Sequence, residues 1–495
     1  MDWLADFTVR GLNIISSLFV LAVGTGVLVV IIMFFLDKFQ SKDSIRHNFP
    51  VFGRFRYLFS HLGEFFRQYF FALDREEMPF NRSERDWVYK SAKGISNTAP
   101  FGSTLNLRIA GTLMFVPAGF AMLDRDAEEC PPVIFGPDTD NPYEGKSIVN
   151  ISGMSFGSLS APAIEALSHG AAKAGCWMNT GEGGLSPYHL KGGCDIIFQI
   201  GTAKYGARDH DGNFSEEKFR ENALRPQVKM IELKLSQGAK PGKGGILPAE
   251  KVTEEIAAIR GIPVGKASIS PNRHPEIDSY DDLLDFIGRL RKLSGKPVGV
   301  KTVLGDDSWV GELCEAITRR GAADAPDFIT LDGGDGGTGA APQPLLDNVG
   351  LPLRESLPML VDGLIRNGLR ERIKVICAGK LITPAEVAWA YCAGADAVNT
   401  ARGFMFSIGC IQAMRCHTNT CPTGVTTHKK HLQDGLNPAS KSVRVANYVD
   451  RMNKDVSTIA HSCGVSHPRA LQRRHVRIVQ GNGRSVCYSE LYPTG

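Results

Sequence analysis

The stretch Phe-Ile-Thr-Leu-Asp-Gly-Gly-Asp-Gly-Gly-Thr-Gly at residues 328–339 runs from an apolar, β-rich segment directly into a glycine-rich turn. Similar segments recur from about residue 150 onward, and stretches with the apolar spacing of amphipathic helices separate several of them. Alternation of strands and helices predicts a parallel sheet with helices outside it. The predicted strands are residues 149–152, 176–180, 196–200, 229–235, 266–270, 298–302, 328–332, 375–379 and 396–400.

Nine segments compete for the eight strand positions of a closed (β/α)8 barrel, so we expect one of them, residues 266–270, to be a loop. An open, doubly wound α/β sheet is the alternative. It is disfavoured because no GxGxxG motif follows a strand and opens a helix. Thr383 and Glu386 have the spacing of a helix capping box, as do Ser279 and Asp282. The predicted helices are residues 161–173, 280–293, 308–320, 356–367 and 384–392.

Five of the predicted strands end in glycine-rich or polar turns. In a (β/α)8 barrel the active site lies at the carboxyl ends of the strands, and a phosphate often binds after the last two. Glycine-rich turns let backbone N–H groups approach an anion, so five of them together favour a cofactor phosphate over ordinary loops. The candidate cofactor-binding residues in these turns are Met154, Ser155, Asp335, Gly336, Gly337, Gly379, Lys380, Ala401, Arg402 and Gly403.

Residues 12–36 form an apolar run without charges, behind a short leader at residues 1–11. Because about 20 apolar residues span a bilayer, this run predicts a transmembrane helix. A signal peptide is the alternative, but the leader is acidic and the run is longer than in most such peptides. By the positive-inside rule, the basic residues that follow place the C-terminal body on the cytoplasmic face of the plasma membrane. These residues are Lys38, Lys42, Arg46, Arg54 and Arg56.

The segment at residues 37–90 is basic and aromatic, and residues 55–71 are its most aromatic part. This part either lies in the membrane interface, where aromatic rings are favoured, or forms an ordinary helix packed on the barrel. The charges of Arg56, Glu64 and Arg67 argue against a second spanning helix. We expect the barrel to occupy residues 91–465 and a C-terminal tail to follow at residues 466–495.

Composition excludes two classes of function. A net charge of +4, without a basic helix carrying interleaved aromatic residues, does not indicate a nucleic-acid partner. The 11 cysteines are scattered along the chain rather than arranged as the disulfide framework of a secreted protein.

Three of the cysteines, Cys410, Cys416 and Cys421, lie close together with the spacing Cys-x5-Cys-x4-Cys. Such a group of thiolates in the cytoplasm favours a metal or a cluster over a disulfide. Zinc would need a fourth ligand, which His417 or His428 could supply. A proline directly after the last cysteine is typical of iron–sulfur loops. From spacing alone, an iron–sulfur cluster, a zinc ion and a structural role all remain open.

Several motifs, taken in order, resemble the FMN-binding domain of glutamate synthase over about residues 91–465. The resemblance implies FMN as the flavin and a [3Fe-4S] cluster on Cys410, Cys416 and Cys421. The motifs are MSFGSLS (154–160), TGEGG (180–184), QGAKPG (237–242), ISPNRHPEIDSYDDL (269–283), GGDGGTGAAP (333–342) and CHTNTCPTGV (416–425).

The resemblance also implies roles for individual side chains. Lys240 and Arg260 correspond to the cations that hold the carboxylates of a 2-oxoacid, and Gln237 to a neighbouring polar contact. Glu182 corresponds to a carboxylate near the place where ammonia meets the oxoacid, suited to acid–base catalysis. Lys301 resembles a lysine at the flavin pyrimidine edge, where a cation stabilises reduced anionic flavin.

The chain departs from the family pattern at three positions. Lys243, Ile246 and Gly334 stand where the family usually has Glu, Gln and His. We also find no glutaminase domain with an N-terminal cysteine and no long C-terminal β-helix, so we expect ammonia or another amine as nitrogen donor unless a partner subunit supplies it.

The expected function is therefore reductive amination of a 2-oxoacid resembling 2-oxoglutarate, by an oxidoreductase that acts on CH-NH2 donors. No nicotinamide site is visible, so the electrons would come from a donor protein or a separate reductase subunit. The alternative is a membrane-bound flavin and iron–sulfur module for electron transfer or redox sensing, without amination activity.

Overall fold

The computed structural model describes residues 2–493, which fall into two compact units divided between Arg82 and Ser83. The start of the predicted leader at Met1 and the end of the predicted tail at residues 494–495 lie outside the described residues. Each unit is described by itself below.

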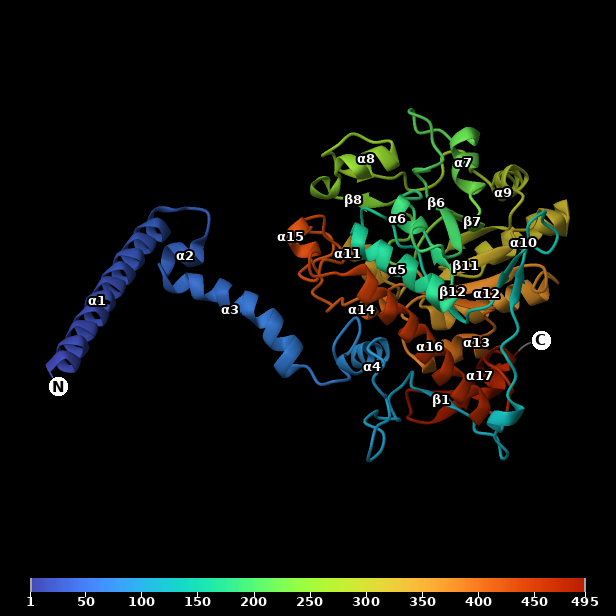
Figure 1. The fold of residues 1–495 in the computed structure, drawn as a ribbon. Helices are drawn as coiled ribbons and strands as arrows, with labels where there is room; N and C mark the ends of the chain where they lie inside the picture. The colour runs from blue at the N-terminus through green and yellow to red at the C-terminus, as the bar shows by residue number, and fades with distance from the viewer. Residues whose placement is uncertain (1, 494–495) are drawn as a thin grey trace. The chain divides into compact units, whose positions relative to one another are not determined.

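The second unit is built on a closed barrel of eight parallel strands, which confirms the predicted (β/α)8 fold (Figure 1). The barrel closes where β13 pairs with β4, with Val398 opposite Val149. Its strands are buried almost throughout, as expected for parallel strands covered on both faces. They are β4 (Val149–Ile151), β5 (Met178–Asn179), β6 (Ile196–Ile200), β7 (Val228–Lys234), β10 (Val298–Thr302), β11 (Phe328–Asp332), β12 (Lys374–Ala378) and β13 (Ala397–Thr400).

The ninth predicted strand takes no place in the barrel. Within residues 266–270, β9 (Ser268–Ile269) pairs antiparallel with β8 (Ile246–Leu247) in a separate two-stranded sheet. This confirms that one of the nine predicted strands belongs to a loop region.

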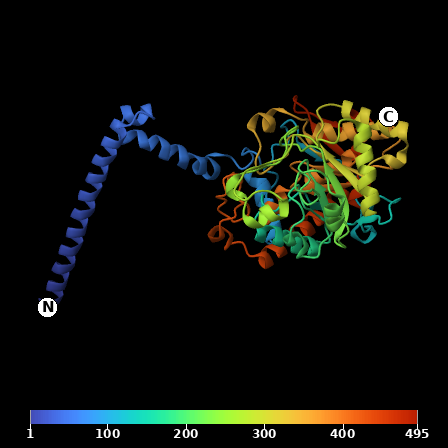
Figure 2. The ribbon, with the colours of Figure 1, turned by 90° about the horizontal axis from the view of Figure 1, so that it is seen from above.

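Helices surround the barrel strands in both ribbon views (Figure 1 and Figure 2). All five predicted helices are present, and α12 begins three residues earlier than predicted. They are α5 (Ala161–Ala174), α9 (Tyr280–Ser294), α10 (Ser308–Arg320), α12 (Leu353–Arg366) and α13 (Pro384–Ala393). The other helices of this unit are α4 (Arg82–Ala92), α6 (Pro187–Leu190), α7 (Glu216–Ala223), α8 (Glu254–Arg260), α11 (Gln343–Asn348), α14 (Arg402–Ser407), α15 (Lys430–Gln433), α16 (Pro438–Ser462) and α17 (Tyr488–Leu491).

One of the two predicted helix starts is wrong in its detail. Ser279 caps α9, because its side chain accepts a hydrogen bond from the N–H of Asp282 at 3.2 Å. At α13, by contrast, the Thr383 side chain makes no capping hydrogen bond. Glu386 forms an ion pair with Arg354 of α12 at 2.9 Å. This tertiary ion pair engages the carboxylate that the predicted capping box would have used.

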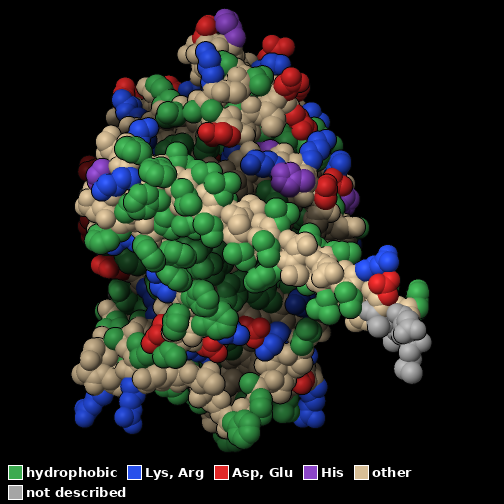
Figure 3. All heavy atoms as spheres, turned by 90° about the vertical axis from the view of Figure 1, so that its left-hand side faces the viewer, with side chains coloured by type: hydrophobic (Ala, Val, Ile, Leu, Met, Phe, Trp, Pro, Cys, Tyr) green, Lys and Arg blue, Asp and Glu red, His purple; other side chains and the backbone are tan. Residues whose placement is uncertain are grey.

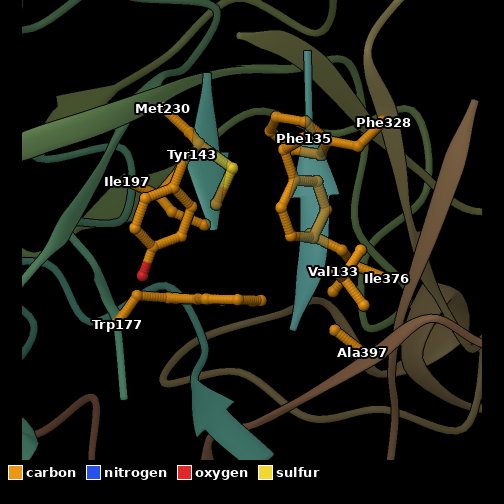
Figure 4. Packing of buried hydrophobic residues seen from close by; sticks show 9 residues of the cluster. All are labelled: Val133, Phe135, Tyr143, Trp177, Ile197, Met230, Phe328, Ile376 and Ala397. Carbon is orange, nitrogen blue, oxygen red and sulfur yellow. The ribbon is translucent and has the colours of Figure 1, made fainter. Parts of the chain in front are cut away.

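A β-hairpin closes the amino-terminal end of the barrel, a feature that the sequence analysis did not predict. β2 (Val133–Phe135) and β3 (Tyr143–Gly145) form this hairpin, and its apolar side chains pack against residues at the starts of the barrel strands (Figure 4). The ring of Phe135 lies edge-on to those of Trp177 and Phe328, with centroids 5.7 Å apart in each case. With this end filled by side chains, the carboxyl ends of the strands remain as the place for a site.

A three-stranded sheet joins segments near the two ends of the second unit. β1 (Leu113–Phe115) pairs with β14 (Val476–Val479), which in turn pairs with β15 (Ser485–Cys487). Arg473 anchors this C-terminal region to α12 through Asp362, at 2.6 Å. The predicted tail is therefore packed against the body over the residues that the structure describes.

The first unit consists of α1 (Asp2–Phe39), α2 (Ser44–Asn48), α3 (Phe52–Phe66) and a π-helical turn (Arg67–Phe71). Figure 3 shows hydrophobic side chains gathered on the face that it turns toward the viewer. By length and composition α1 is able to cross a membrane over residues Asp6–Phe39, a property that a signal sequence shares.

Candidate active site

The predicted site residues follow the carboxyl ends of the barrel strands. Because all eight strands run parallel, these ends meet at one rim, opposite the hairpin. Glu182 follows β5, Lys240 follows β7, and Gly379 follows β12.

The carboxylate of Glu182 is enclosed at this rim. Its Oε1 lies 3.1 Å from Nζ of Lys234, the last residue of β7. A Cβ on Gly201 would lie 2.7 Å from the Glu182 Cβ, and one on Gly245 would lie 2.7 Å from Oε1. Larger residues at either glycine would push the carboxylate out of its position.

Glu182 is ionised in this environment. Burial by itself raises the pKa of the carboxyl group, but the nearby cations Lys234, Lys240 and Arg260 together hold the pKa below its ordinary value. An ionised carboxylate is able to accept hydrogen bonds from an ammonium ion and to take part in proton transfer.

Lys240 is a buried cation beside Glu182. Burial lowers the pKa of Lys240 to about 8, an effect that Lys234 and Lys243 increase and Glu182 opposes. An anionic ligand next to this ammonium group would favour its charged form.

Arg260 closes α8 and reaches the loop that follows β4. Its Nη2 donates to the carbonyl oxygen of Phe156 at 3.0 Å, and its guanidinium lies 5.1 Å from the ring centroid of Tyr205. Burial lowers the pKa of Arg260, while Tyr205 and Glu182 oppose that shift, so the guanidinium remains charged.

Two buried donors at this rim have no hydrogen-bond partner: Nε of Arg260 and Nε2 of Gln237. The other amide atom of Gln237, Oε1, accepts from Nζ of Lys234. An unsatisfied buried donor costs about 1–3 kcal/mol, which the acceptor oxygens of a ligand would recover. The three cations exceed the single carboxylate of Glu182 by two charges, so the rim suits a dianionic ligand.

A second buried carboxylate, Glu232, lies inside the barrel and was not predicted. It accepts hydrogen bonds from Asn179 of β5 at 2.7 Å, Gln199 of β6 at 2.6 Å and Thr330 of β11 at 2.5 Å, so the network crosses the barrel interior. An acidic residue in the apolar segment at residues 229–235 was the signal that could have revealed this network.

Lys301 lies inside the same barrel, with Nζ 3.6 Å from Oδ2 of Asp332. Burial alone lowers its pKa, but Asp332 and Glu232 outweigh burial and raise it, so Lys301 stays charged. Oδ2 of Asp332 also accepts from the N–H of Gly238 at 2.9 Å, which ties the end of β11 to the loop after β7.

The glycine-rich loop after β11 holds three candidate cofactor residues. Oδ1 of Asp335 accepts from the N–H of Leu353 at 3.2 Å, so this carboxylate caps the start of α12. A Cβ on Gly336 would lie 3.0 Å from the carbonyl oxygen of Gly333, whereas one on Gly337 would meet nothing closer than 3.6 Å. Gly337 therefore leaves room for another group to approach the backbone.

The turn after β12 adopts backbone angles that favour glycine. Gly379 has φ +133°, and Lys380 has φ +53° although it carries a side chain. This turn also packs on the glycine-rich loop, because the N–H of Gly333 donates to the carbonyl oxygen of Ala378 at 2.8 Å.

Arg402 joins the glycine-rich loop to the cysteine loop. Its Nη2 donates to the carbonyl oxygen of Thr338 at 2.7 Å, and its Nη1 lies 3.8 Å from Sγ of Cys416. Next to it, Ala401 occupies the N-cap position of α14 without a side-chain hydrogen bond, and a side chain on Gly403 would collide with the ring of Tyr448. Packing on α16 is thus one reason for a glycine at this position.

The loop after β4 is held by a buried histidine that was not predicted. Nε2 of His189 donates to the carbonyl oxygen of Met154 at 2.9 Å, while its Nδ1 bonds with Ser186 Oγ at 2.8 Å. Burial lowers the pKa of His189 to about 4, so the ring is neutral. Ser155 follows Met154 in this loop. A Cβ on Gly183 would lie only 2.9 Å from the Cβ of Ser155, so the two loops pack closely at this point.

The three clustered cysteines have free thiols, with Cys410 and Cys421 buried and Cys416 partly exposed. Among residues 2–493, no group of three or more His, Cys, Asp or Glu side chains lies close enough to hold a metal ion. His428, one of the two histidines considered for zinc, has its Nε2 2.8 Å from the carbonyl oxygen of Gly157.

Lys251 connects the cysteine loop to the loop after β4. From a buried position its Nζ donates to the carbonyl oxygens of Ser158 at 2.8 Å and Cys416 at 3.1 Å. Together with Arg402 it supplies positive charge beside the thiols, which suits thiolate ligands. No pattern in the sequence distinguishes this lysine from a surface residue.

The fold and the rim define a (β/α)8 barrel protein whose strand ends gather buried cations, an ionised carboxylate and a cysteine loop. Residues 109–466 match the conserved region in glutamate synthase, and the chain belongs to the glutamate synthase family. The resemblance found in the motifs is thereby confirmed.

Relatives span most of the chain. The glutamate synthase large subunit-like protein YerD of Bacillus subtilis (strain 168) is 40% identical over 494 residues, covering 92% of this chain and 93% of its own. A glutamate synthase large subunit-like protein of Rhizobium meliloti (strain 1021) is 30% identical and covers 77% of this chain and 87% of its own. The archaeal glutamate synthase [NADPH] of Methanocaldococcus jannaschii is 33% identical. The matched region covers 67% of this chain and 61% of the length of that protein.

Proposed function

We propose that this protein reductively aminates a 2-oxoacid resembling 2-oxoglutarate, with FMN and a [3Fe-4S] cluster as cofactors. The observation that carries the proposal is the pairing of Glu182 with Lys234 at 3.1 Å, beside buried Lys240 and Arg260. Membership of the glutamate synthase family supports an oxidoreductase with flavin and iron–sulfur cofactors.

In this proposal the side chains bind the substrate by charge. Lys240 and Arg260 hold the two carboxylates of the oxoacid, and the unpartnered Nε2 of Gln237 donates to one of its oxygens. Glu182 accepts a proton from the ammonium ion, so that the free amine attacks the keto carbon and water leaves. When bound, FMN supplies the hydride that reduces the resulting imine.

The same rim offers groups for the two cofactors. FMN would be held by Lys301, by Met154 and Ser155, and by the turns at residues 335–337, 379–380 and 401–403. Cys410, Cys416 and Cys421 would hold the cluster, with Lys251 and Arg402 balancing the charge of the thiolates. The support for a cluster is the chemistry of the donors: three thiols on one loop are soft ligands, which suit iron in a cluster better than they suit hard cations. The three side chains do not converge on one point in the described structure, so the loop would rearrange when the cluster binds.

We further propose that α1 anchors the protein in a membrane. The basic residues after residue 36 then place the body on the cytoplasmic face, by the positive-inside rule. A donor protein or a separate reductase subunit would supply the electrons, and ammonia or another amine the nitrogen.

A membrane-bound electron-transfer or redox-sensing module is the second candidate. Lys243 and Ile246 favour it, because they lie in the loop after Lys240 and differ from the usual family residues. Ile246 pairs with Ile269 in the β8–β9 sheet, so this part of the loop has a structural role of its own.

The test is an anaerobic visible spectrum and iron analysis of the detergent-purified protein, followed by ammonia and 2-oxoglutarate. We expect flavin bands, iron, a spectral response to the oxoacid and formation of an amino acid by the reduced protein. Flavin and iron without a response to any 2-oxoacid would contradict amination and favour the electron-transfer module.

A further inference from the structure

A buried carboxylate holds the turn between α1 and α3. Asp37 accepts hydrogen bonds from Arg46 at 2.7 and 2.9 Å, from Arg54 at 2.7 and 2.8 Å, and from the N–H of Val51 at 3.1 Å. Val51 has φ +65°, an unusual conformation for a β-branched residue. Because such a conformation persists only where neighbouring contacts enforce it, the turn holds α3 in a defined orientation to α1.

α3 presents an exposed apolar face. Phe52 is 77% exposed, Phe59 is 65% exposed, and Phe70 in the following π-helical turn is 74% exposed. The opposite face carries Arg56, Ser60, His61 and Glu64. Along the apolar face lie Phe52, Phe55, Leu58, Phe59, Leu62, Phe65 and Phe66. An amphipathic helix with bulky apolar residues on one side is suited to the boundary between lipid headgroups and acyl chains.

An apolar cavity of about 690 Å³ lies within the same unit, between the end of α1 and the turn. Val30, Ile31, Phe34 and Phe35 of α1 form one wall, and residues 48–52 form the other. The α1 residues belong to the last two turns of its uncharged run. If α1 spans a bilayer, the cavity lies at the depth where acyl chains meet the headgroup region.

The segments that line the cavity are followed or interrupted in the sequence by basic residues. Arg46 and Arg54 are engaged by Asp37, whereas Lys38, Lys42 and Arg56 are exposed. Basic residues immediately cytoplasmic of a membrane-spanning helix attract anionic headgroups. Charge and apolar surface thus point to the same type of ligand.

We propose that this elbow, residues 30–71, is a binding site for an anionic phospholipid of the surrounding bilayer. α3 lies in the membrane interface with its apolar face toward the acyl chains, and one acyl chain occupies the cavity between α1 and residues 48–52. The headgroup phosphate is held by Lys38, Lys42 and Arg56. The inference rests on the proposed anchoring by α1, and it decides between the two interpretations of the aromatic segment in favour of the membrane.

The experiment uses the full-length protein in lipid nanodiscs that contain phosphatidylglycerol with a photoactivatable acyl chain. After irradiation, mass spectrometry locates the lipid adducts. We expect adducts on the cavity residues and on the apolar face of α3, and the double variant Phe55→Ser/Phe59→Ser should lose those on α3. The matched control Phe101→Ser/Phe120→Ser, which changes two fully exposed phenylalanines of the second unit, should keep all adducts.

Headgroup selectivity is measured with the variant Lys42→Gln/Arg56→Gln. Its preference for phosphatidylglycerol over phosphatidylcholine should fall about fivefold per charge removed, as expected for basic residues at an anionic surface. The control Lys218→Gln, which changes an exposed residue of α7, should leave this preference unchanged.

Each failure has its own signature. Adducts confined to residues 12–29 would overturn the elbow site while leaving the anchor in place. Equal labelling by phosphatidylcholine would overturn the anionic headgroup. Release of the protein from membranes by alkaline carbonate would contradict the anchoring itself.

Discussion

Oε1 of Glu182 lies 3.1 Å from Nζ of Lys234, although the two residues stand 52 positions apart on neighbouring parts of the barrel rim. This pair links the loop after β5 to the end of β7 and brings an ionised carboxylate next to the cations proposed to bind the substrate.

Glu182→Gln should separate substrate binding from turnover. The amide cannot accept a proton from ammonium, so we expect the amination rate to fall by about 10²–10⁴, the range of general acid–base contributions. Binding of 2-oxoglutarate should persist, since the variant leaves all three cations in place. Spectral titration measures binding, and amino-acid formation measures turnover.

The control for this variant is Glu276→Gln, which breaks the Lys204–Glu276 pair of equal length, 3.1 Å, outside the proposed substrate contacts. It should lower turnover much less than Glu182→Gln does. Equal losses in the two variants would contradict a chemical role for Glu182.

Binding of the oxoacid should weaken as the pH rises above about 8. Burial lowers the pKa of Lys240 to about 8, so its positive charge is present below that pH and is lost above it. A plot of the dissociation constant of 2-oxoglutarate against pH should therefore be flat below 8 and rise beyond it.

Lys240→Arg offers the matched comparison, because arginine stays charged across this range. The upward bend in its binding profile should disappear or move to higher pH. If wild type and Lys240→Arg bend at the same pH, another group controls binding.

Phe135→Ala should destabilise the second unit by about 3–5 kcal/mol, as large-to-small changes at buried aromatic residues do. The ring packs on Trp177 and Phe328 at the closed end of the barrel, so its loss leaves a cavity there. Denaturant unfolding measures the change. Phe101→Ala, at a fully exposed ring, should alter the stability by no more than about 0.5 kcal/mol.

Cys421→Ser should abolish the iron content if the cysteine loop binds a cluster, because a hydroxyl replaces one of only three thiolates. Iron analysis and the visible spectrum of the purified variant measure this loss. Cys463→Ser, at another buried cysteine, should keep wild-type iron. Wild-type iron in Cys421→Ser would remove this residue from the proposed ligand set.

Local patterns in the sequence were sufficient for the barrel. Apolar β-rich segments such as residues 196–200 and 298–302 occupy their predicted strands because burial on both faces of a parallel sheet demands apolar residues at nearly every position. The start of α9 at Ser279 was equally accessible, since its cap involves residues three positions apart.

Contacts between distant segments were not accessible in this way. The capping box at Thr383 did not form, because Arg354 from another helix takes the carboxylate of Glu386. Lys234 and Lys251 were missed because each acquires its role from partners on other strands or loops. Glu232 left a signal, an acidic residue in an apolar segment, but its partners lie on other strands and could not be read from that segment.

By itself, the sequence determined the strand–helix alternation, the glycine-rich strand ends, the cysteine spacing and the long apolar run, all of which depend on neighbours within a few residues. Three interactions were decided only by the tertiary structure: the ion pair of Lys234 with Glu182, the hydrogen bonds of Glu232 inside the barrel, and the ion pairs of Asp37 with two arginines. The reason is physical: hydrophobic periodicity is a property of one segment, whereas burial, ion pairing and pKa depend on which segments the closed fold brings together.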